Sequence, residues 1–154
     1  MPRPKAGDPA PGFSGLTTDD ARVSLRDFRG KKLVLYFYPM DDTPGCTAQA
    51  CSLRDHNQDI KAKGAAILGV SAQDVDSHRK FAAKHKLNFP LLADTDRSVG
   101  RAYGTIGGGI GGALRGMLGL AERVTFIIDE KGRVVHVIDS PDTANHAEQV
   151  LKLL

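Results

Sequence analysis

The sequence predicts an α/β fold in which helices flank a central mixed β-sheet. Strand-like and helix-like segments alternate as β-α-β-α-β through the first part of the chain, which is typical of parallel strands joined by crossover helices. Nearer the C terminus, Glu-Lys-Gly at 130–132 separates two strand-like segments, and this pattern predicts an antiparallel hairpin. The chain has 154 residues with no linker or internal repeat, so we expect a single domain over residues 1–154.

Each expected element has a local signal. Four of the eight prolines lie in the first 11 residues, so residues 1–12 are expected to form an extended tail. Short apolar runs predict buried strands at 33–38, 65–70 and 89–92, and the hairpin strands are expected at 123–129 and 133–139. Runs without Pro or Gly predict helices at 46–63, 75–85 and 143–154.

The composition argues against several classes of function. The formal net charge is +3 and no block of five like charges occurs, so no nucleic-acid partner is expected. The N-terminal residues MPRPKAGDPAPG contain no apolar stretch typical of a secretory signal, so we expect a cytoplasmic protein with no membrane partner. Two cysteines are too few for a disulfide framework or for an all-thiolate zinc site.

The segment YFYPMDDTPGCTAQAC at 36–51 carries the strongest chemical signal. A buried strand runs into a loop stiffened by Pro39 and Pro44, and the loop delivers Cys46 to the start of a helix. Free backbone N–H groups and the positive helix end stabilise a thiolate there, so Cys46 is expected to be reactive. The hydroxyl groups of Thr43 and Thr47 can hydrogen-bond a thiolate or a bound oxygen ligand.

The second cysteine, Cys51, follows five residues later inside the same expected helix. Helix geometry separates such positions by about 8 to 9 Å at Cα, whereas a disulfide needs less than about 7 Å. The two cysteines are therefore either chemically unrelated, for example two small residues of the core, or they take part in a cycle in which the helix unwinds locally. A zinc site that adds His56 does not match the usual ligand spacings.

With these residues the sequence resembles the peroxiredoxins, and specifically their bacterioferritin comigratory protein (Q-type) branch. Pro39, Thr43 and Cys46 fill the pattern P-x-x-x-T-x-x-C of that family. The resemblance continues in ILGVS at 67–71, FPLLAD at 89–94, AYG at 102–104 and ERVTFIID at 122–129, and it extends from about residue 13 to the end.

The resemblance implies a thioredoxin-like fold and a thiol-dependent peroxidase that reduces hydrogen peroxide and organic hydroperoxides. It implies that Cys46 is the peroxidatic cysteine, Cys51 the resolving cysteine that forms an intramolecular disulfide with it, and Arg123 the active-site arginine. A thioredoxin-type dithiol would reduce the disulfide, with no cofactor or metal, in a monomer or weak dimer. The family usually has Lys at Met40 and often Glu at Gln49, so this chain lacks a carboxylate that can contact the arginine in other members.

Three further features remain open at the level of sequence. Eight of the 17 glycines lie within 104–119, which we interpret as a loop with a small apolar patch; its G-x-G-x-x-G match at 107–112 lacks the context of a dinucleotide-binding fold. Asp41 and Asp42 are expected to be solvated loop residues. The alternative functions are thiol–disulfide exchange without peroxidase activity and a binding module that uses the glycine-rich segment.

Overall fold

The computed structural model describes residues 3–106 and 120–154 and contains a five-stranded sheet in the order β5-β4-β3-β6-β7. The strands are β3 (Lys32–Phe37), β4 (Ala65–Ser71), β5 (Leu91–Ala93), β6 (Val124–Ile128) and β7 (Val134–Ile138). β3 pairs in parallel with β4, and β4 with β5, whereas β6 is antiparallel to both β3 and β7. The predicted mixed sheet with a late hairpin is therefore confirmed.

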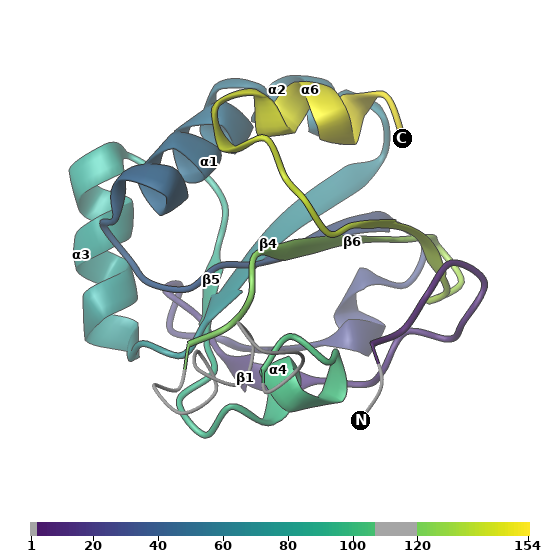
Figure 1. Ribbon diagram of the computed structural model, residues 1–154, viewed down its shortest axis with the longest axis horizontal. Coiled ribbons are helices and arrows are strands. Elements are labelled where there is room, and N and C mark those ends of the chain that lie inside the picture. Colours follow the sequence, from purple (N-terminus) through teal and green to yellow (C-terminus); the bar gives the residue numbers. More distant parts are fainter. Residues whose placement is uncertain (1–2, 107–119) are drawn as a thin grey trace.

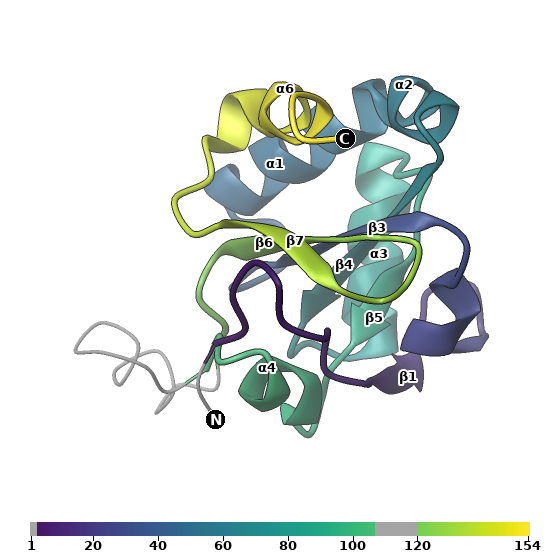
Figure 2. The ribbon, with the colours of Figure 1, turned by 90° about the vertical axis from the view of Figure 1, so that its right-hand side faces the viewer.

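Helices cover both faces of this sheet (Figures 1 and 2). The helices are α1 (Pro44–Asp55), α2 (Asn57–Ala62), α3 (Val75–His85), α4 (Ser98–Ala102) and α6 (His146–Leu151), with short 3-10 turns η1 (Leu25–Phe28) and η2 (Thr143–Asn145). Figure 2 shows α1, α2 and α6 above the sheet, with α4 and the small hairpin strand β1 (Ser14–Leu16) below it.

The central strand β3 is apolar along almost all of its length because both of its faces are buried. Val34 and Tyr36 belong to the core on the α1 face, together with residues of α1, α2, α3 and α6. Leu35 and Phe37 belong to the opposite core, which includes residues of α4. Because both faces of β3 are covered, its residues do not alternate between apolar and polar. Such continuous apolar runs are usual for the central strands of α/β sheets.

The structure corrects the expected helix boundaries. The helix expected over 46–63 begins earlier, at Pro44, and is broken at His56, which has φ −114° and ψ 13°. The buried Asn57 follows the break and donates hydrogen bonds from Nδ2 to the backbone carbonyl and side-chain oxygen of Asn88, both at 3.1 Å. The C-terminal helix is likewise shorter than expected, because Thr143–Asn145 is a 3-10 turn and α6 ends at Leu151.

Residues 3–12 do not project from the domain as a tail. The backbone N–H of Gly7 donates to the carbonyl of Val134 at 2.8 Å, and the N–H of Val134 donates to the carbonyl of Asp8 at 2.9 Å. The segment therefore lies along the start of β7. The second strand of the small hairpin is β2 (Arg22–Ser24), and this hairpin was not expected because each of its strands has only three residues.

Candidate active site

Cys46 lies in the first turn of α1, directly beyond the end of β3. Thr43 is the N-cap residue with extended backbone angles, Pro44 is the first helical residue, and the N–H of Thr47 donates to the carbonyl of Thr43 at 2.8 Å. The Thr43 hydroxyl donates to the carbonyl of Met40 at 3.2 Å. Cys46 is 1 % exposed, so its sulfur is held in the positive end of the helix and away from bulk solvent.

Arg123 reaches this sulfur from the strand next to β3. It precedes β6, and the pairing of Phe37 with Val124 brings it to the edge where β3 ends. Its Nη2 lies 3.3 Å from Cys46 Sγ, and its Nη1 donates to Gln49 Oε1 at 2.8 Å. The neutral Gln49 therefore tethers the guanidinium without a carboxylate.

Gly45 leaves room for this contact. A Cβ atom at position 45 would lie 3.1 Å from Nη2 of Arg123, tighter than ordinary van der Waals packing. A side chain there would therefore press on the guanidinium that faces Cys46.

Tyr36 adds a neutral hydroxyl beneath α1 that was not expected from the sequence. Burial raises the pKa of Tyr36 well above its ordinary value of 10.0, and the charge of a Cys46 thiolate raises it further. The phenol therefore keeps its proton close to the reactive sulfur. Nothing in the sequence distinguishes Tyr36 from the core residues around it on β3.

Cys51 is half-buried on the same continuous helix, and both thiols are free. The two helical cysteines are therefore about 8 to 9 Å apart at Cα, beyond the reach of a disulfide. Arg54 is a cationic neighbour of the Cys51 sulfur. The structure thus brings Cys46 and Arg123 together and leaves Cys51 apart from Cys46. Thr43 precedes the same helix with its hydroxyl on the Met40 carbonyl, and Pro39 lies at the start of the same loop.

The expectation that both loop aspartates are solvated is wrong for Asp41. Its side chain is 5 % exposed, and its carboxylate accepts hydrogen bonds from Tyr38 Oη at 2.6 Å and from Ser77 Oγ at 2.7 Å. Asp42 is exposed, as expected, and pairs with Lys84 Nζ at 2.8 Å.

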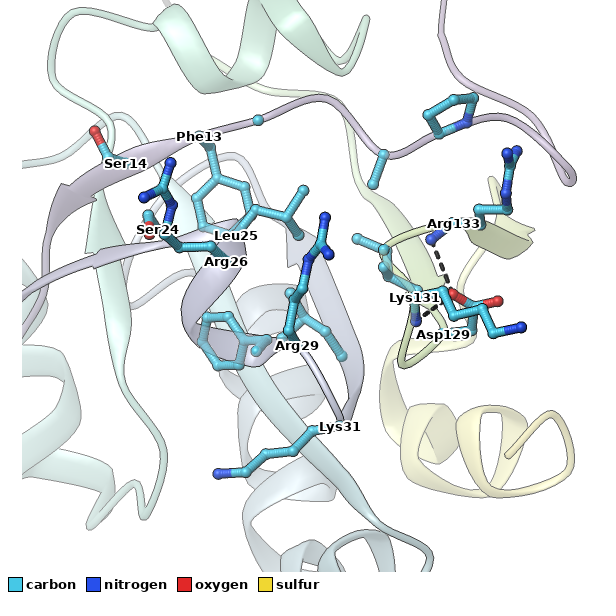
Figure 3. A pocket seen from close by; sticks show the side chains of 17 residues that line it. Phe13, Ser14, Ser24, Leu25, Arg26, Arg29, Lys31, Asp129, Lys131 and Arg133 are labelled. Carbon is cyan, nitrogen blue, oxygen red and sulfur yellow. Dashed lines mark hydrogen bonds between the residues drawn. The ribbon is translucent and has the colours of Figure 1, made fainter.

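A hollow of about 710 Å³ lies at the opposite end of the sheet, where β3 begins and β6 ends (Figure 3). Phe13 and Leu25 contribute apolar surface to it, and five cationic side chains also line it. These are Arg26, Arg29, Lys31, Lys131 and Arg133. Neither cysteine lines this hollow, so the thiol chemistry takes place elsewhere.

Within residues 3–106 and 120–154, membrane-spanning helices and metal sites are absent. No helix there is long and apolar enough to cross a bilayer, and no three His, Cys, Asp or Glu side chains gather as a metal site requires. The loop expected within 104–119 lies mostly outside the described residues, and so does the glycine pattern at 107–112.

Comparisons with known proteins agree with the geometry around Cys46. The model of the AhpC/TSA family matches residues 6–137. Peroxiredoxin Bcp of Escherichia coli is 41% identical, over 97% of this chain and 95% of that protein. A chloroplastic peroxiredoxin Q of Triticum aestivum is 38% identical, over 96% of this chain and 65% of that protein.

Solved structures of similar proteins have the same fold. Peroxidoxin BcpB of Mycobacterium tuberculosis matches with a TM-score of 0.85 and 30% identity, over 97% of this chain and 96% of that one. Peroxiredoxin Q of Xanthomonas campestris matches with a TM-score of 0.82 and 34% identity, over 92% of this chain and 88% of that one. With its thioredoxin-like fold, the chain belongs to the AhpC/TSA family and is a peroxiredoxin of the Bcp and Q kind, a thiol-dependent peroxidase.

Proposed function

We propose that Cys46 is the peroxidatic cysteine of this peroxidase and Cys51 the resolving cysteine. The observation that carries the proposal is the guanidinium of Arg123, 3.3 Å from Cys46 Sγ at the first turn of α1. A cation and a helix N-terminus both favour the thiolate, which is the nucleophile. Cys51 is the second thiol of the chain, and it lies on the same helix.

In the first step, the Cys46 thiolate attacks one oxygen of the peroxide. An S–O bond forms while the O–O bond breaks, and the leaving oxygen takes up a proton and departs as water or an alcohol. Cys46 is thereby oxidised to a sulfenic acid, and the peroxide receives two electrons. Arg123 stabilises the negative charge that develops on the peroxide oxygens. The Thr43 oxygen, whose own proton is donated to the Met40 carbonyl, can accept a hydrogen bond from the O–H of the peroxide, and Pro39 restricts the loop that carries Thr43.

In the second step, Cys51 must reach the oxidised sulfur. The first turns of α1 unwind, which breaks the contacts of Arg123 with Cys46 and Gln49. The Cys51 sulfur then attacks the sulfenic sulfur, an S–S bond forms and water leaves. Because a continuous helix keeps the sulfurs apart, unwinding is a required part of each turnover.

A dithiol reductant of the thioredoxin type returns the disulfide to two thiols and is itself oxidised to a disulfide. The substrates that we propose are hydrogen peroxide and organic hydroperoxides, since alkyl peroxide reduction activity is ascribed to the similar bacterioferritin comigratory protein of Xanthomonas campestris. We further propose that the protein acts in the cytoplasm as a monomer or weak dimer, without a nucleic-acid or membrane partner. Sedimentation at several concentrations tests the oligomeric state.

Peroxide titration followed by mass mapping under non-reducing conditions tests the two cysteine roles. We expect one peroxide equivalent per chain to produce a peptide pair joined by Cys46 and Cys51. An overoxidised Cys46 together with a free Cys51 thiol would contradict the resolving role. Reduction of insulin disulfides without consumption of peroxide would instead indicate a thiol–disulfide exchange protein.

A further inference from the structure

We propose that Asp41 and His78 form a buried positioning pair that holds the loop at 39–43 against α3 and thereby sets the place of the Cys46 thiol. This inference rests on the proposed role of Cys46. Both residues act on the sulfur indirectly, through the loop and the first turn of α1.

The carboxylate of Asp41 is surrounded by donors. Oδ1 accepts from the Tyr38 hydroxyl at 2.6 Å, and Oδ2 lies 2.7 Å from both Ser77 Oγ and His78 Nδ1. Burial alone would raise the pKa of Asp41, but the hydrogen bond and charge of His78, with the hydrogen bonds of Tyr38 and Ser77, hold it below its ordinary value of 3.8. At neutral pH the loop therefore carries a fixed anion that faces α3.

His78 connects this anion to the sheet. Its side chain is fully buried, and its Nε2 lies 3.1 Å from the carbonyl oxygen of Leu92 in β5. That carbonyl oxygen can only accept, and on the other side of the ring Nδ1 lies 2.7 Å from Asp41 Oδ2. The imidazole thus links the loop to β5 through two hydrogen bonds.

The backbone of the loop has a second connection to the same part of the fold. The N–H of Asp41 donates to Gln73 Oε1 at 3.0 Å, and Gln73 Nε2 donates to the carbonyl of Pro39 at 3.4 Å. The Ser71 hydroxyl donates to the same Gln73 Oε1. Both ends of the segment 39–41 are therefore attached to the chain that follows β4.

Little freedom remains between Asp41 and the reactive sulfur. Asp42 adopts a left-handed conformation with φ 63°, the Thr43 hydroxyl is bonded to the carbonyl of Met40, and Thr43 is the residue directly before the first turn of α1. A displacement of Asp41 is therefore passed to Cys46 and to its distance from Arg123. A misplacement of about 1 Å can cost on the order of a hundredfold in rate.

The test separates positioning from stability by a double variant. Asp41→Asn leaves His78 buried without its charged partner, so it should lower the melting temperature and also slow the oxidation of Cys46 by about tenfold. Asp41→Ala combined with His78→Leu replaces the pair by apolar groups, which is often neutral for stability. We expect this double variant to recover its melting temperature but to remain slow.

The rate is measured in a single turnover of the reduced protein with hydrogen peroxide, by rapid quenching and mass spectrometry of the Cys46 peptide. Asp76→Asn is the control, because Asp76 is an exposed carboxylate in the first turn of α3 that lies outside the loop and 4.0 Å from its partner Arg79, so we expect an unchanged rate. Recovery of the rate together with the melting temperature in the double variant would overturn the proposal.

A further comparison covers the case in which the double variant does not fold. His78→Gln keeps a donor for Asp41, whereas His78→Leu does not, so we expect the glutamine variant to oxidise several-fold faster. Equal rates would contradict the positioning role. Full peroxidase activity in Cys46→Ser would instead contradict the proposed function, and the two failures are therefore distinguishable.

Discussion

The two ends of α1 are held in different ways. At the N-terminal end, one side chain, Arg123, contacts both Cys46 and Gln49. At the C-terminal end, hydrogen bonds lead to two other parts of the fold: Ser52 Oγ accepts from the N–H of Ala147 in α6, and Arg54 Nη1 donates to the carbonyl of His85 at the end of α3.

This difference teaches where the helix can open. In the proposed cycle the first turns must leave Arg123, whereas the later turns keep their hydrogen bonds to α6 and α3. The proposed peroxidatic thiol thus lies at the end that Arg123 contacts. Substitutions at each end of α1 should therefore have effects of different kinds.

The largest effect is expected at the reactive sulfur itself. Cys46→Ser removes the nucleophile while it keeps a similar shape, so peroxide consumption should fall by roughly a thousandfold or more. The assay is peroxide loss with excess dithiol reductant. Activity close to that of the parent protein would show that Cys46 is not the peroxidatic residue.

Removal of the cation at the same end comes next. Arg123→Gln keeps a donor but removes the positive charge, so the rate of Cys46 oxidation should fall by about a hundredfold. Arg123→Lys is the matched control, which keeps the charge but not the fork of donors, and its rate should lie between those of the parent and the glutamine variant. A rate unaffected by either change would show that Arg123 takes no part in the oxidation of Cys46.

A change farther along the helix should affect turnover and leave the first reaction intact. Cys51→Ser should still consume one peroxide equivalent per chain at the parent rate, because the surroundings of Cys46 are unchanged. Turnover coupled to a dithiol should fall by about tenfold or more, since the intramolecular disulfide cannot form. Unimpaired turnover would contradict the resolving role.

The hydrogen bonds at the C-terminal end of α1 are expected to affect the stability of the protein. Ser52→Ala leaves the N–H of Ala147 without its 3.0 Å acceptor and should lower the free energy of unfolding by about 1 kcal/mol. Urea denaturation measures the loss, and faster amide exchange at Ala147 localises it. Ser140→Ala, at an exposed position, is the control that should change neither.

The smallest effect concerns pH. Burial lowers the pKa of His146 below its ordinary value of 6.5, and the charge of Arg123 lowers it further. The unfolded chain then binds more protons, so this contribution to stability is complete above pH 6.5 and is lost as the pH falls below it. His146→Asn should reduce the slope of unfolding free energy against pH by less than about 1.4 kcal/mol per pH unit. Parallel curves for both proteins would contradict this assignment.

Local signals were sufficient for much of the fold and for the start of the site. The strand at 33–38 and the helix at 75–85 are apparent from short patterns, and Cys46 follows from its place after Thr-Pro-Gly. The burial of Asp41 was not predictable, because its partners Ser77 and His78 lie 36 and 37 residues away along the chain. A carboxylate in a loop gives no local sign that a distant helix will cover it.

The distance along the chain between Cys46 and Arg123 has a consequence for synthesis. These residues are 77 positions apart, and they meet only through the pairing of β3 with β6. A chain made from its N terminus therefore carries the thiol long before the guanidinium that contacts it in the folded protein has been added. The nascent protein passes through the ribosome with a cysteine that Arg123 does not yet contact, and this contact forms only after β6 has paired with β3.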